Sequence, residues 1–227
     1  MNKIMITVLT TLRGTALLLT LVLSSTAWSA DKNIAVVVFD GVLTSDVTAP
    51  IEVFGAASKK AWFSDYKVTV ISSTREKSIH TEEGLNIVAD KTIYDGGDYD
   101  VVLVASAYDM DPSLENAPLI DFIRNQGKQA SWMASNCSGA FLLAEAGLLD
   151  GKRATTWAGG EKGLARAYPK VNVEYDRNVV VDDGVITSNG GPVSYQSAFL
   201  LLGKLSSKAF SNEISEQIQF NRLRTAF

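Results

Sequence analysis

Short apolar runs rich in β-branched residues alternate along this chain with segments of helical spacing. This alternation limits the possible fold more than any other feature. Residues 34–39 (Ile-Ala-Val-Val-Val-Phe) and 101–105 (Val-Val-Leu-Val-Ala) have no polar interruption, which predicts strands buried on both faces. Such strands, joined by helices, form a mostly parallel sheet covered on each side. The sequence therefore predicts a doubly wound, three-layer α/β sandwich.

The same patterns predict the individual elements. Strands are expected at residues 34–39, 68–72, 85–88, 101–105, 130–135, 153–157, 171–175, 179–181 and 185–187. Helices are expected at residues 45–60, 111–127, 139–149, 161–168, 193–210 and 212–223. No repeat, low-complexity linker or change of composition interrupts this pattern, so residues 31–227 are expected to form a single domain.

Cys137, the only cysteine, lies where a strand is predicted to turn into a helix. The pentad Ser-Asn-Cys-Ser-Gly at 135–139 has small residues two before and two after the sulfur, a pattern typical of a nucleophile elbow. A position at a helix N-terminus favours the thiolate and predicts a lowered thiol pKa. The alternative interpretation is a buried core cysteine without chemistry.

Polar residues near other strand ends point to the same edge of the sheet. Segments 39–41, 105–107 and 135–137 all follow predicted strands, and in such folds the working site lies beyond the carboxyl ends of the strands. Asp46 comes just after segment 39–41. It is interpreted either as a helix cap or as an acid that moves protons beside the thiol. Ser138 offers a backbone N–H to an oxyanion and a hydroxyl to substrate or water, or else caps a helix.

Other site types find little support. The single histidine, His80, lies in an acidic polar turn and is expected on the surface. One histidine and one cysteine make a zinc or iron site improbable, and no phosphate-binding glycine motif follows the first strand. No metal and no cofactor are therefore expected.

The first thirty residues read as a secretory signal peptide rather than as part of the fold. Lys3 and Arg13 give a positive start, and residues 16–23 form a short apolar core. The small-residue stretch that follows allows cleavage after Ala27, Ser29 or Ala30. The alternative is an uncleaved anchor. A periplasmic or secreted protein is expected, with no membrane attachment after cleavage.

Charge and cysteine content bear on the partners and the compartment expected of the mature chain. Loss of Lys3 and Arg13 changes the formal charge from −4 to −6, which does not favour binding to nucleic acid or to an anionic membrane. One cysteine allows no internal disulfide, so an unpaired thiol in an oxidising compartment calls for an explanation. A small molecule is the expected partner.

Several segments resemble one known family. Residues 34–54, 136–156, 185–191 and 217–220 are similar to the ThiJ/PfpI superfamily, of the class I glutamine amidotransferase-like fold, and within it to the isonitrile hydratase branch. The same segments resemble the amidase-like sensor half of AraC-type regulators. The resemblance implies a flavodoxin-like fold and a homodimer. An apolar region at 199–202 and Phe210 is a candidate dimer surface.

The resemblance also assigns roles. It implies Cys137 as nucleophile, Ser138 as the residue that follows it, and Asp46 as the site acid. Isonitrile hydratases add water to R–N≡C and give an N-substituted formamide. This implies a cysteine-dependent hydratase or hydrolase acting on a small molecule.

Two departures from the family pattern bear on this interpretation. Trp157 stands where many relatives have a histidine, which removes the base of a Cys-His mechanism. Ala105-Ser106-Ala107 replaces a Pro-Gly-Gly whose glycines present an oxyanion N–H, and Tyr108 follows it. Ala107, Tyr108 and Trp157 are therefore candidates for the pocket wall or the oxyanion site. The departures favour a second hypothesis, a non-catalytic protein that binds a ligand or senses redox state through its thiol.

Overall fold

The structure is a computed structural model, and it describes residues 31–62 and 65–225. The predicted signal peptide, residues 1–30, lies outside the described residues.

A seven-stranded sheet runs through the middle of the described chain in the order β10-β11-β7-β6-β1-β2-β5. Its strands are β1 (Lys32–Val38), β2 (Tyr66–Ser72), β5 (Lys91–Thr92), β6 (Val101–Val104), β7 (Trp132–Asn136), β10 (Val179–Asp182) and β11 (Val185–Ser188). Neighbouring strands are parallel except for the antiparallel β10–β11 pair. The inner order β2-β1-β6-β7-β11 is that of a flavodoxin-like fold, as predicted.

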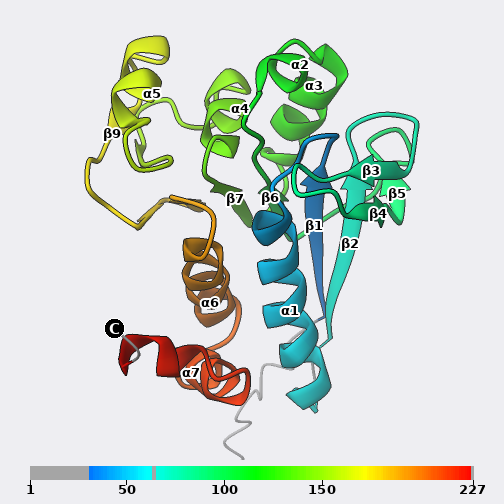
Figure 1. Ribbon diagram of the computed structural model, residues 1–227, viewed down its shortest axis with the longest axis vertical. Helices are drawn as coiled ribbons and strands as arrows, with labels where there is room; N and C mark the ends of the chain where they lie inside the picture. Colours follow the sequence, from blue (N-terminus) through cyan, green and yellow to red (C-terminus); the bar gives the residue numbers. More distant parts are fainter. Residues whose placement is uncertain (1–30, 63–64, 226–227) are drawn as a thin grey trace, which may run out of the picture.

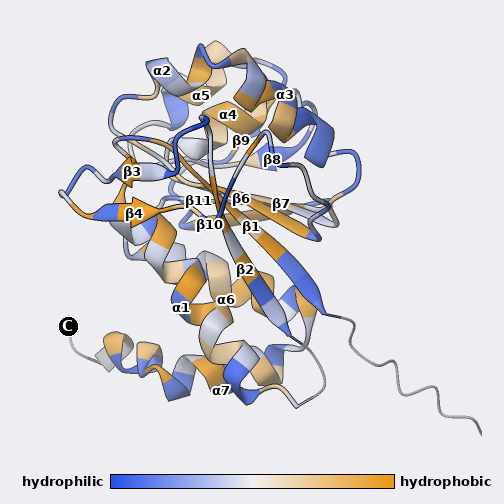
Figure 2. Cartoon of the chain, turned by 90° about the vertical axis from the view of Figure 1, so that its right-hand side faces the viewer, coloured by the Kyte–Doolittle hydropathy of each residue, from blue (hydrophilic) through white to orange (hydrophobic). Residues whose placement is uncertain are grey.

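Helices cover both faces of this sheet (Figures 1 and 2). They are α1 (Thr44–Lys60), α2 (Asp111–Leu114), α3 (Ala117–Gln126), α4 (Gly139–Glu145), α5 (Glu161–Ala167), α6 (Val193–Leu205), α7 (Lys208–Gln217) and the 3₁₀ helix η1 (Phe220–Thr225). Figure 1 shows α1, α6 and α7 together on one face, with α2, α3 and α4 grouped at the other. The three-layer arrangement is therefore confirmed. None of the helices in the described ranges is long and apolar enough to cross a bilayer.

The core lies along the central strands. Residues 34–38 of β1 and 101–104 of β6 are fully buried, and Figure 2 shows these strands largely in the hydrophobic colour. Burial of such continuous apolar runs on both faces is the main stabilising contribution to a parallel sheet.

Two predicted helices are interrupted, each by a capping residue. The helix expected at 193–210 ends at Leu205, and α7 starts after Ser207, whose Oγ accepts a hydrogen bond from Phe210 N (3.1 Å). The helix expected at 111–127 divides in the same way at Asn116, whose Oδ1 accepts from Leu119 N (3.2 Å). Apolar residues continue at helical spacing through both breaks, so the pattern predicts one helix. The capping side chain instead bonds a backbone N–H and starts a new helix there.

Three predicted strands pair outside the main sheet. Residues 86–88 form β4, which pairs antiparallel with β3 (Ser78–His80) in a hairpin. The strands predicted at 171–175 and 153–157 shorten to β9 (Asn172–Val173) and β8 (Arg153–Ala154), which pair parallel with each other. Short polar-flanked strands such as these carry no signal that fixes their partner.

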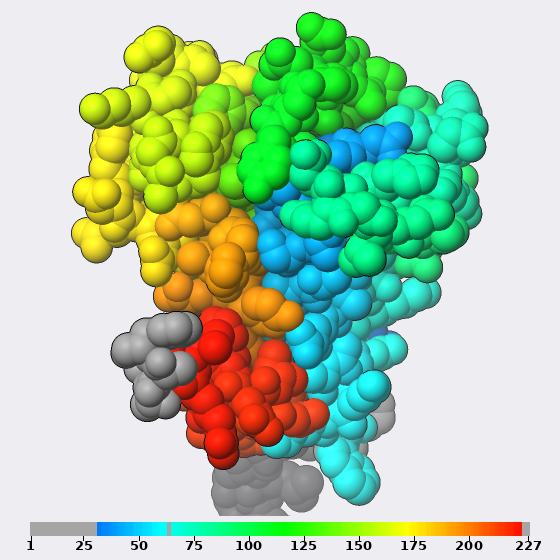
Figure 3. Space-filling view, in the orientation of Figure 1, coloured from blue at the N-terminus to red at the C-terminus, as the bar shows by residue number. Residues whose placement is uncertain are grey.

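The apolar region proposed as a dimer surface is mostly covered within the chain. Leu201 and Leu202 are fully buried, Phe199 packs on Phe220 with ring centroids 5.1 Å apart, and Phe210 stacks against Tyr66. Figure 3 shows α7 seated directly below α6 on this face. Only the edge remains open, as a groove of about 640 Å³ whose lining includes the exposed Leu200. Because α7 folds back over α6, most of the candidate dimer surface is covered within one chain, and Leu200 at the groove is the part that stays exposed.

Candidate active site

Three loops meet where the strand order reverses, at the carboxyl ends of β1, β6 and β7. Asp46 lies in the first turn of α1 after β1, Ser106 follows β6, and Cys137 follows β7. Strands β2 and β5 lie on one side of β1, whereas β6, β7 and β11 lie on the other side. The strand order therefore reverses between β1 and β6, and such a reversal opens the crevice in which these folds bind ligands. The predicted convergence of these strand ends is confirmed.

Cys137 sits on a strained turn, as the elbow pattern predicts. Its φ angle is +49°, in the left-handed region that non-glycine residues avoid. Two hydrogen bonds hold the turn: Cys137 N donates to Ser188 O (2.8 Å), and Thr156 Oγ1 donates to Cys137 O (2.8 Å). These bonds fix the backbone of Cys137, and its side chain is half-buried at the edge of the sheet. The interpretation as an inert core cysteine does not fit this geometry.

Gly139 is required by the close approach of β6 to the elbow. A Cβ at this position would lie 2.6 Å from Val104 O and 2.7 Å from Ala105 O, and both are backbone atoms. Gly139→Ala is expected to destabilise the fold by about 1–3 kcal/mol, the usual range for an overpacked site. The measurement is the unfolding midpoint in denaturant.

The control for this prediction is Gly163→Ala in α5. A Cβ there meets only Phe141 Cζ at 3.8 Å, an ordinary contact, so alanine is expected to stabilise the helix by up to about 1 kcal/mol. If Gly139→Ala and Gly163→Ala unfold at the same denaturant concentration, the backbone at the elbow is not tightly packed.

Asp46 is not a helix cap. The N-cap of α1 is Leu43, and no side chain of the helix caps it. The carboxyl group of Asp46 is fully buried, and it accepts hydrogen bonds from Ser106 Oγ (2.5 Å), Ser194 Oγ (2.7 Å) and Gly191 N (2.9 Å). Burial raises the pKa of Asp46 above its ordinary value, although these three hydrogen bonds oppose the rise. A raised pKa is what a residue that carries protons needs.

The cap of α1 comes from elsewhere in the chain. Glu83, in the turn of the β3–β4 hairpin, accepts hydrogen bonds through Oε2 from Thr44 N (2.9 Å) and Thr44 Oγ1 (2.6 Å). These bonds lower the pKa of Glu83, and its negative charge adds to the rise in the pKa of Asp46. The sequence analysis missed Glu83, because nothing in an exposed turn signals a contact thirty-nine residues away.

The lowered thiol pKa predicted for Cys137 is wrong in direction. Burial raises the pKa of the thiol, the negative charge of Asp46 raises it further, and hydrogen bonds from Ser106 and Ser138 offset the rise only in part. The helix that follows, α4, is only seven residues long. Its dipole is too short to outweigh desolvation and a neighbouring carboxylate.

Hydrogen bonding by the backbone and the side chain of Ser138 lowers the pKa of the Cys137 thiol. The hydroxyl also donates to Ala107 O (2.8 Å), which ties the elbow to the loop after β6. The N–H of Ala107 donates to Met110 Sδ (3.2 Å) instead of standing free as an oxyanion donor. The amide of Ser138 is thus better placed than that of Ala107 to meet developing negative charge.

Ser106 is the second residue that the sequence analysis missed as a site residue. It is fully buried, its hydroxyl donates to Asp46, and its hydrogen bonding lowers the pKa of the Cys137 thiol. Its position directly beyond a buried strand, in the altered Ala105–Ala107 segment, was the available signal.

The remaining candidates lie at the margin of the site. Tyr108 is 79% exposed, so it forms no buried pocket wall. Trp157 is 38% exposed and stacks on Phe141 with ring centroids 5.4 Å apart. His80 is exposed beside Asp40, which confirms its placement on the surface. In the described residues no three side chains among His, Cys, Asp and Glu form a potential metal cluster.

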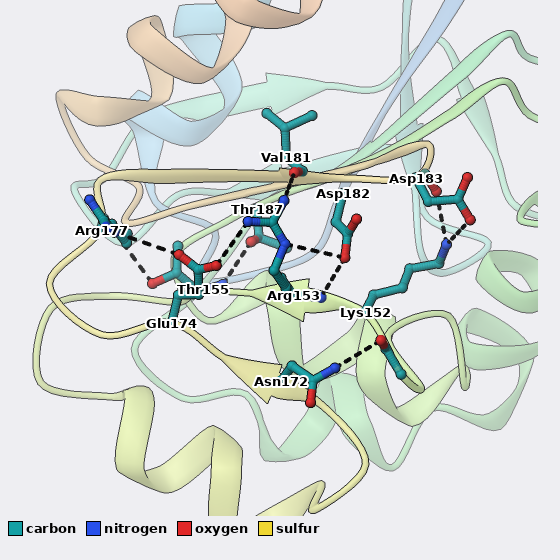
Figure 4. Close-up of polar contacts among 11 residues, drawn as sticks. Lys152, Arg153, Thr155, Asn172, Glu174, Arg177, Val181, Asp182, Asp183 and Thr187 are labelled. Atoms are coloured by element: carbon teal, nitrogen blue, oxygen red, sulfur yellow. Dashed lines mark hydrogen bonds and ion pairs between the residues drawn. The ribbon is translucent and has the colours of Figure 1, made fainter.

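A polar network fixes the segment that carries Thr156 and Trp157 (Figure 4). Arg153 donates to Val181 O (3.0 Å) and Glu174 Oε1 (3.1 Å), and its backbone N–H donates to Asp182 Oδ2 (2.8 Å). Deeper in the protein, Thr155 N donates to Thr187 Oγ1 (2.8 Å). These contacts attach the segment to the β10–β11 hairpin, and so they hold the Thr156 hydroxyl against the elbow.

The fold and the elbow together define an α/β protein with a strained cysteine at the topological switch point. The sequence pattern of the DJ-1/PfpI family matches residues 32–202, and the chain belongs to this family.

Relatives within the family have different functions. The chain is 32% identical over 162 residues to "Isonitrile hydratase" from Pseudomonas putida, covering 70% of this chain and 65% of that protein. It is 26% identical over 148 residues to "HTH-type transcriptional regulator GbdR" from Pseudomonas aeruginosa, covering 65% of this chain and 40% of that protein. Thus the chain matches less than two thirds of the length of either relative. A solved ThiJ/PfpI family protein from Pseudomonas syringae superposes with a TM-score of 0.76 at 22% identity, over 87% of this chain and 78% of that one.

Proposed function

We propose that this protein is a cysteine-dependent hydratase that converts isonitriles to N-substituted formamides, with Cys137 as nucleophile, Asp46 as acid and base, and Ser138 as oxyanion donor. The observation that carries the proposal is a fully buried carboxyl group of raised pKa beside the single, still partly accessible thiol. The similarity to an isonitrile hydratase supports the choice of substrate.

The first step is an addition of the thiol to one carbon atom. The S–H bond of Cys137 breaks, and its proton passes to Asp46. The sulfur then bonds to the terminal carbon of R–N≡C while Asp46 returns the proton to the lone pair of that carbon. The product is a thioimidate, R–N=CH–S–Cys, formed without net change of charge in the buried site.

The second step uses water. Asp46 takes a proton from water as the oxygen adds to the thioimidate carbon, and it passes this proton to the nitrogen, which regenerates the carboxylate. The C–S bond then breaks as the second water proton moves to the sulfur, which releases R–NH–CHO and the free thiol. Negative charge that builds up beside the elbow during this step meets the N–H of Ser138.

The raised thiol pKa weighs against the redox-sensing alternative. Oxidation requires the thiolate, and sensor cysteines have low pKa values. Burial and the charge of Asp46 act in the opposite direction at Cys137. A reaction in which one carbon receives both the sulfur and the proton tolerates a neutral thiol, because the thiol supplies both. Ligand binding without turnover is the competing function, and the similarity of the chain to a transcriptional regulator, GbdR, supports it.

The decisive assay offers a panel of alkyl and aryl isonitriles to the purified protein in water enriched in ¹⁸O. Formamide that carries one ¹⁸O atom and forms in proportion to enzyme supports hydration. Ligand-induced rises in melting temperature without formamide would replace the hydratase by a binding protein.

We further propose that the enzyme acts after export, on the basis of residues 1–30, whose pattern is that of a signal peptide. Intact mass of the protein from a periplasmic extract should correspond to cleavage after Ala27, Ser29 or Ala30. A full-length mass in the cytosolic fraction alone would refute export. The homodimer stays a prediction that rests on the family resemblance.

A further inference from the structure

We propose that Ser106 is the proton relay between Cys137 and Asp46, passing the thiol proton to the carboxylate and returning it to the carbon bonded to sulfur. This inference rests on the proposed function for its reaction, although its central claim concerns two groups of the free protein. The hydroxyl of a serine suits the role because it donates one proton and accepts another in a single concerted exchange.

The position of Ser106 carries the argument. Its side chain is fully buried, so bulk water does not compete for its hydrogen bonds. Its Oγ lies 2.5 Å from Asp46 Oδ2, a short contact for two oxygens, and hydrogen bonding by the Ser106 side chain also lowers the pKa of the Cys137 thiol. Cys137 and Asp46 are themselves neighbours, because a Cβ at Gly190 would touch both Cys137 Cβ and Asp46 Oδ1. One atom therefore bridges the proposed acid and the proposed nucleophile.

The two carboxyl oxygens of Asp46 are not equivalent, and the difference fixes the route. Oδ1 accepts from the backbone N–H of Gly191 (2.9 Å) and from the Ser194 hydroxyl (2.7 Å). A backbone N–H only donates, so Oδ1 is held as an acceptor. A proton on Asp46 is therefore placed on Oδ2, the oxygen that faces Ser106.

The transfer of the thiol proton through Ser106 to Asp46 needs no other reactant. As the S–H bond of Cys137 breaks, its proton bonds to Ser106 Oγ, and the original Ser106 proton moves to Asp46 Oδ2. The thiolate and the neutral acid replace the thiol and the carboxylate, so the net charge of the pair is unchanged. The reverse movement delivers a proton from Ser106 Oγ to the isonitrile carbon once that carbon lies against the sulfur.

The matched variants are Ser106→Ala and Ser194→Ala. Each removes one serine hydroxyl from the same buried carboxyl group, but of the two only Ser106 also lowers the pKa of the Cys137 thiol by hydrogen bonding. Ser106→Thr keeps a hydroxyl and serves as the rescue. Glu83 is the other ionisable group whose charge acts on Asp46, and it is unchanged in all three proteins.

The first readout is the rate of Cys137 alkylation by iodoacetamide against pH, which needs no substrate. Loss of a hydrogen bond to the thiolate should move the midpoint upward by about one pH unit in Ser106→Ala. Ser194→Ala should move it far less. Superimposable profiles for wild type and Ser106→Ala, or equal shifts in the two alanine variants, would overturn the relay.

The second readout is turnover of isonitrile. Ser106→Ala should lose about 10-fold or more in kcat with KM little changed, Ser194→Ala should lose clearly less, and Ser106→Thr should recover most of the loss. A folded Ser106→Thr protein as slow as Ser106→Ala would overturn the relay. If the threonine variant does not fold, the two alanine variants decide. A midpoint shift in an enzyme that hydrates no isonitrile would support the relay and refute the proposed substrate.

Discussion

Cys137→Ser is expected to lower kcat/KM for isonitrile hydration by about 10³-fold or more while the protein stays folded. The hydroxyl of serine is nearly the same size as the thiol but far less nucleophilic and far less acidic. The bonds that hold the turn involve the backbone N–H and C=O of residue 137, and these remain in the variant. The loss should therefore appear in activity and not in the melting temperature.

The measurement combines formamide production with thermal melts of both proteins. Intact mass spectrometry of the wild type, quenched in acid during turnover, should reveal a thioimidate adduct that the serine variant lacks. Residual activity within about tenfold of wild type would remove Cys137 from the covalent step.

Asp46→Asn is expected to reduce kcat by about 10²-fold or more, the usual scale for loss of a general acid and base. The amide keeps an acceptor for Gly191 and Ser194 and gives a donor to Ser106 in place of a carboxylic proton. It thus mimics the protonated acid in shape but holds a proton that it cannot transfer.

The same variant makes a prediction about stability against pH. The folded-state pKa of Asp46 is raised, so its contribution to stability is fully present below the unfolded pKa and is lost as pH rises through the folded value. Asparagine does not titrate. At neutral pH the variant should therefore melt at the same or a higher temperature than wild type, with the difference disappearing in acid.

The control is Asp40→Asn, which changes an exposed carboxylate in the loop after β1. It should leave kcat close to that of the wild type. A wild-type kcat in Asp46→Asn would exclude Asp46 from proton transfer, and a melting temperature that falls at neutral pH would contradict its raised pKa.

The architecture was largely predictable from sequence because long apolar strands admit few arrangements. The runs at 34–39 and 101–105 are buried on both faces, and this requirement alone fixes a parallel sheet with helices on each side. The breaks at Asn116 and Ser207 were not predicted, since a capping side chain and a solvent-facing helical serine or asparagine look alike in one sequence.

The candidate site was predictable where the signal was local. Cys137 and Gly139 lie within one pentad whose steric demands act between neighbours, and both behave as the elbow pattern requires. Ser106 and Glu83 owe their roles to contacts made only in the folded chain, so their types and neighbours gave little indication. The direction of the thiol pKa failed for the same reason, because burial and the charge of Asp46 are properties of the assembled structure.

The hydrogen bonds of Asp46 have a consequence for when this protein becomes competent during folding. Its partners Ser106, Gly191 and Ser194 are 60, 145 and 148 residues away along the chain. Closing such loops is slow and comes only after local structure has formed. The environment that raises the pKa of the acid exists only once the beginning and the end of the domain have met. The proposed catalytic activity is thus expected only of a completely folded chain, because a partly folded chain carries Cys137 without the buried acid beside it.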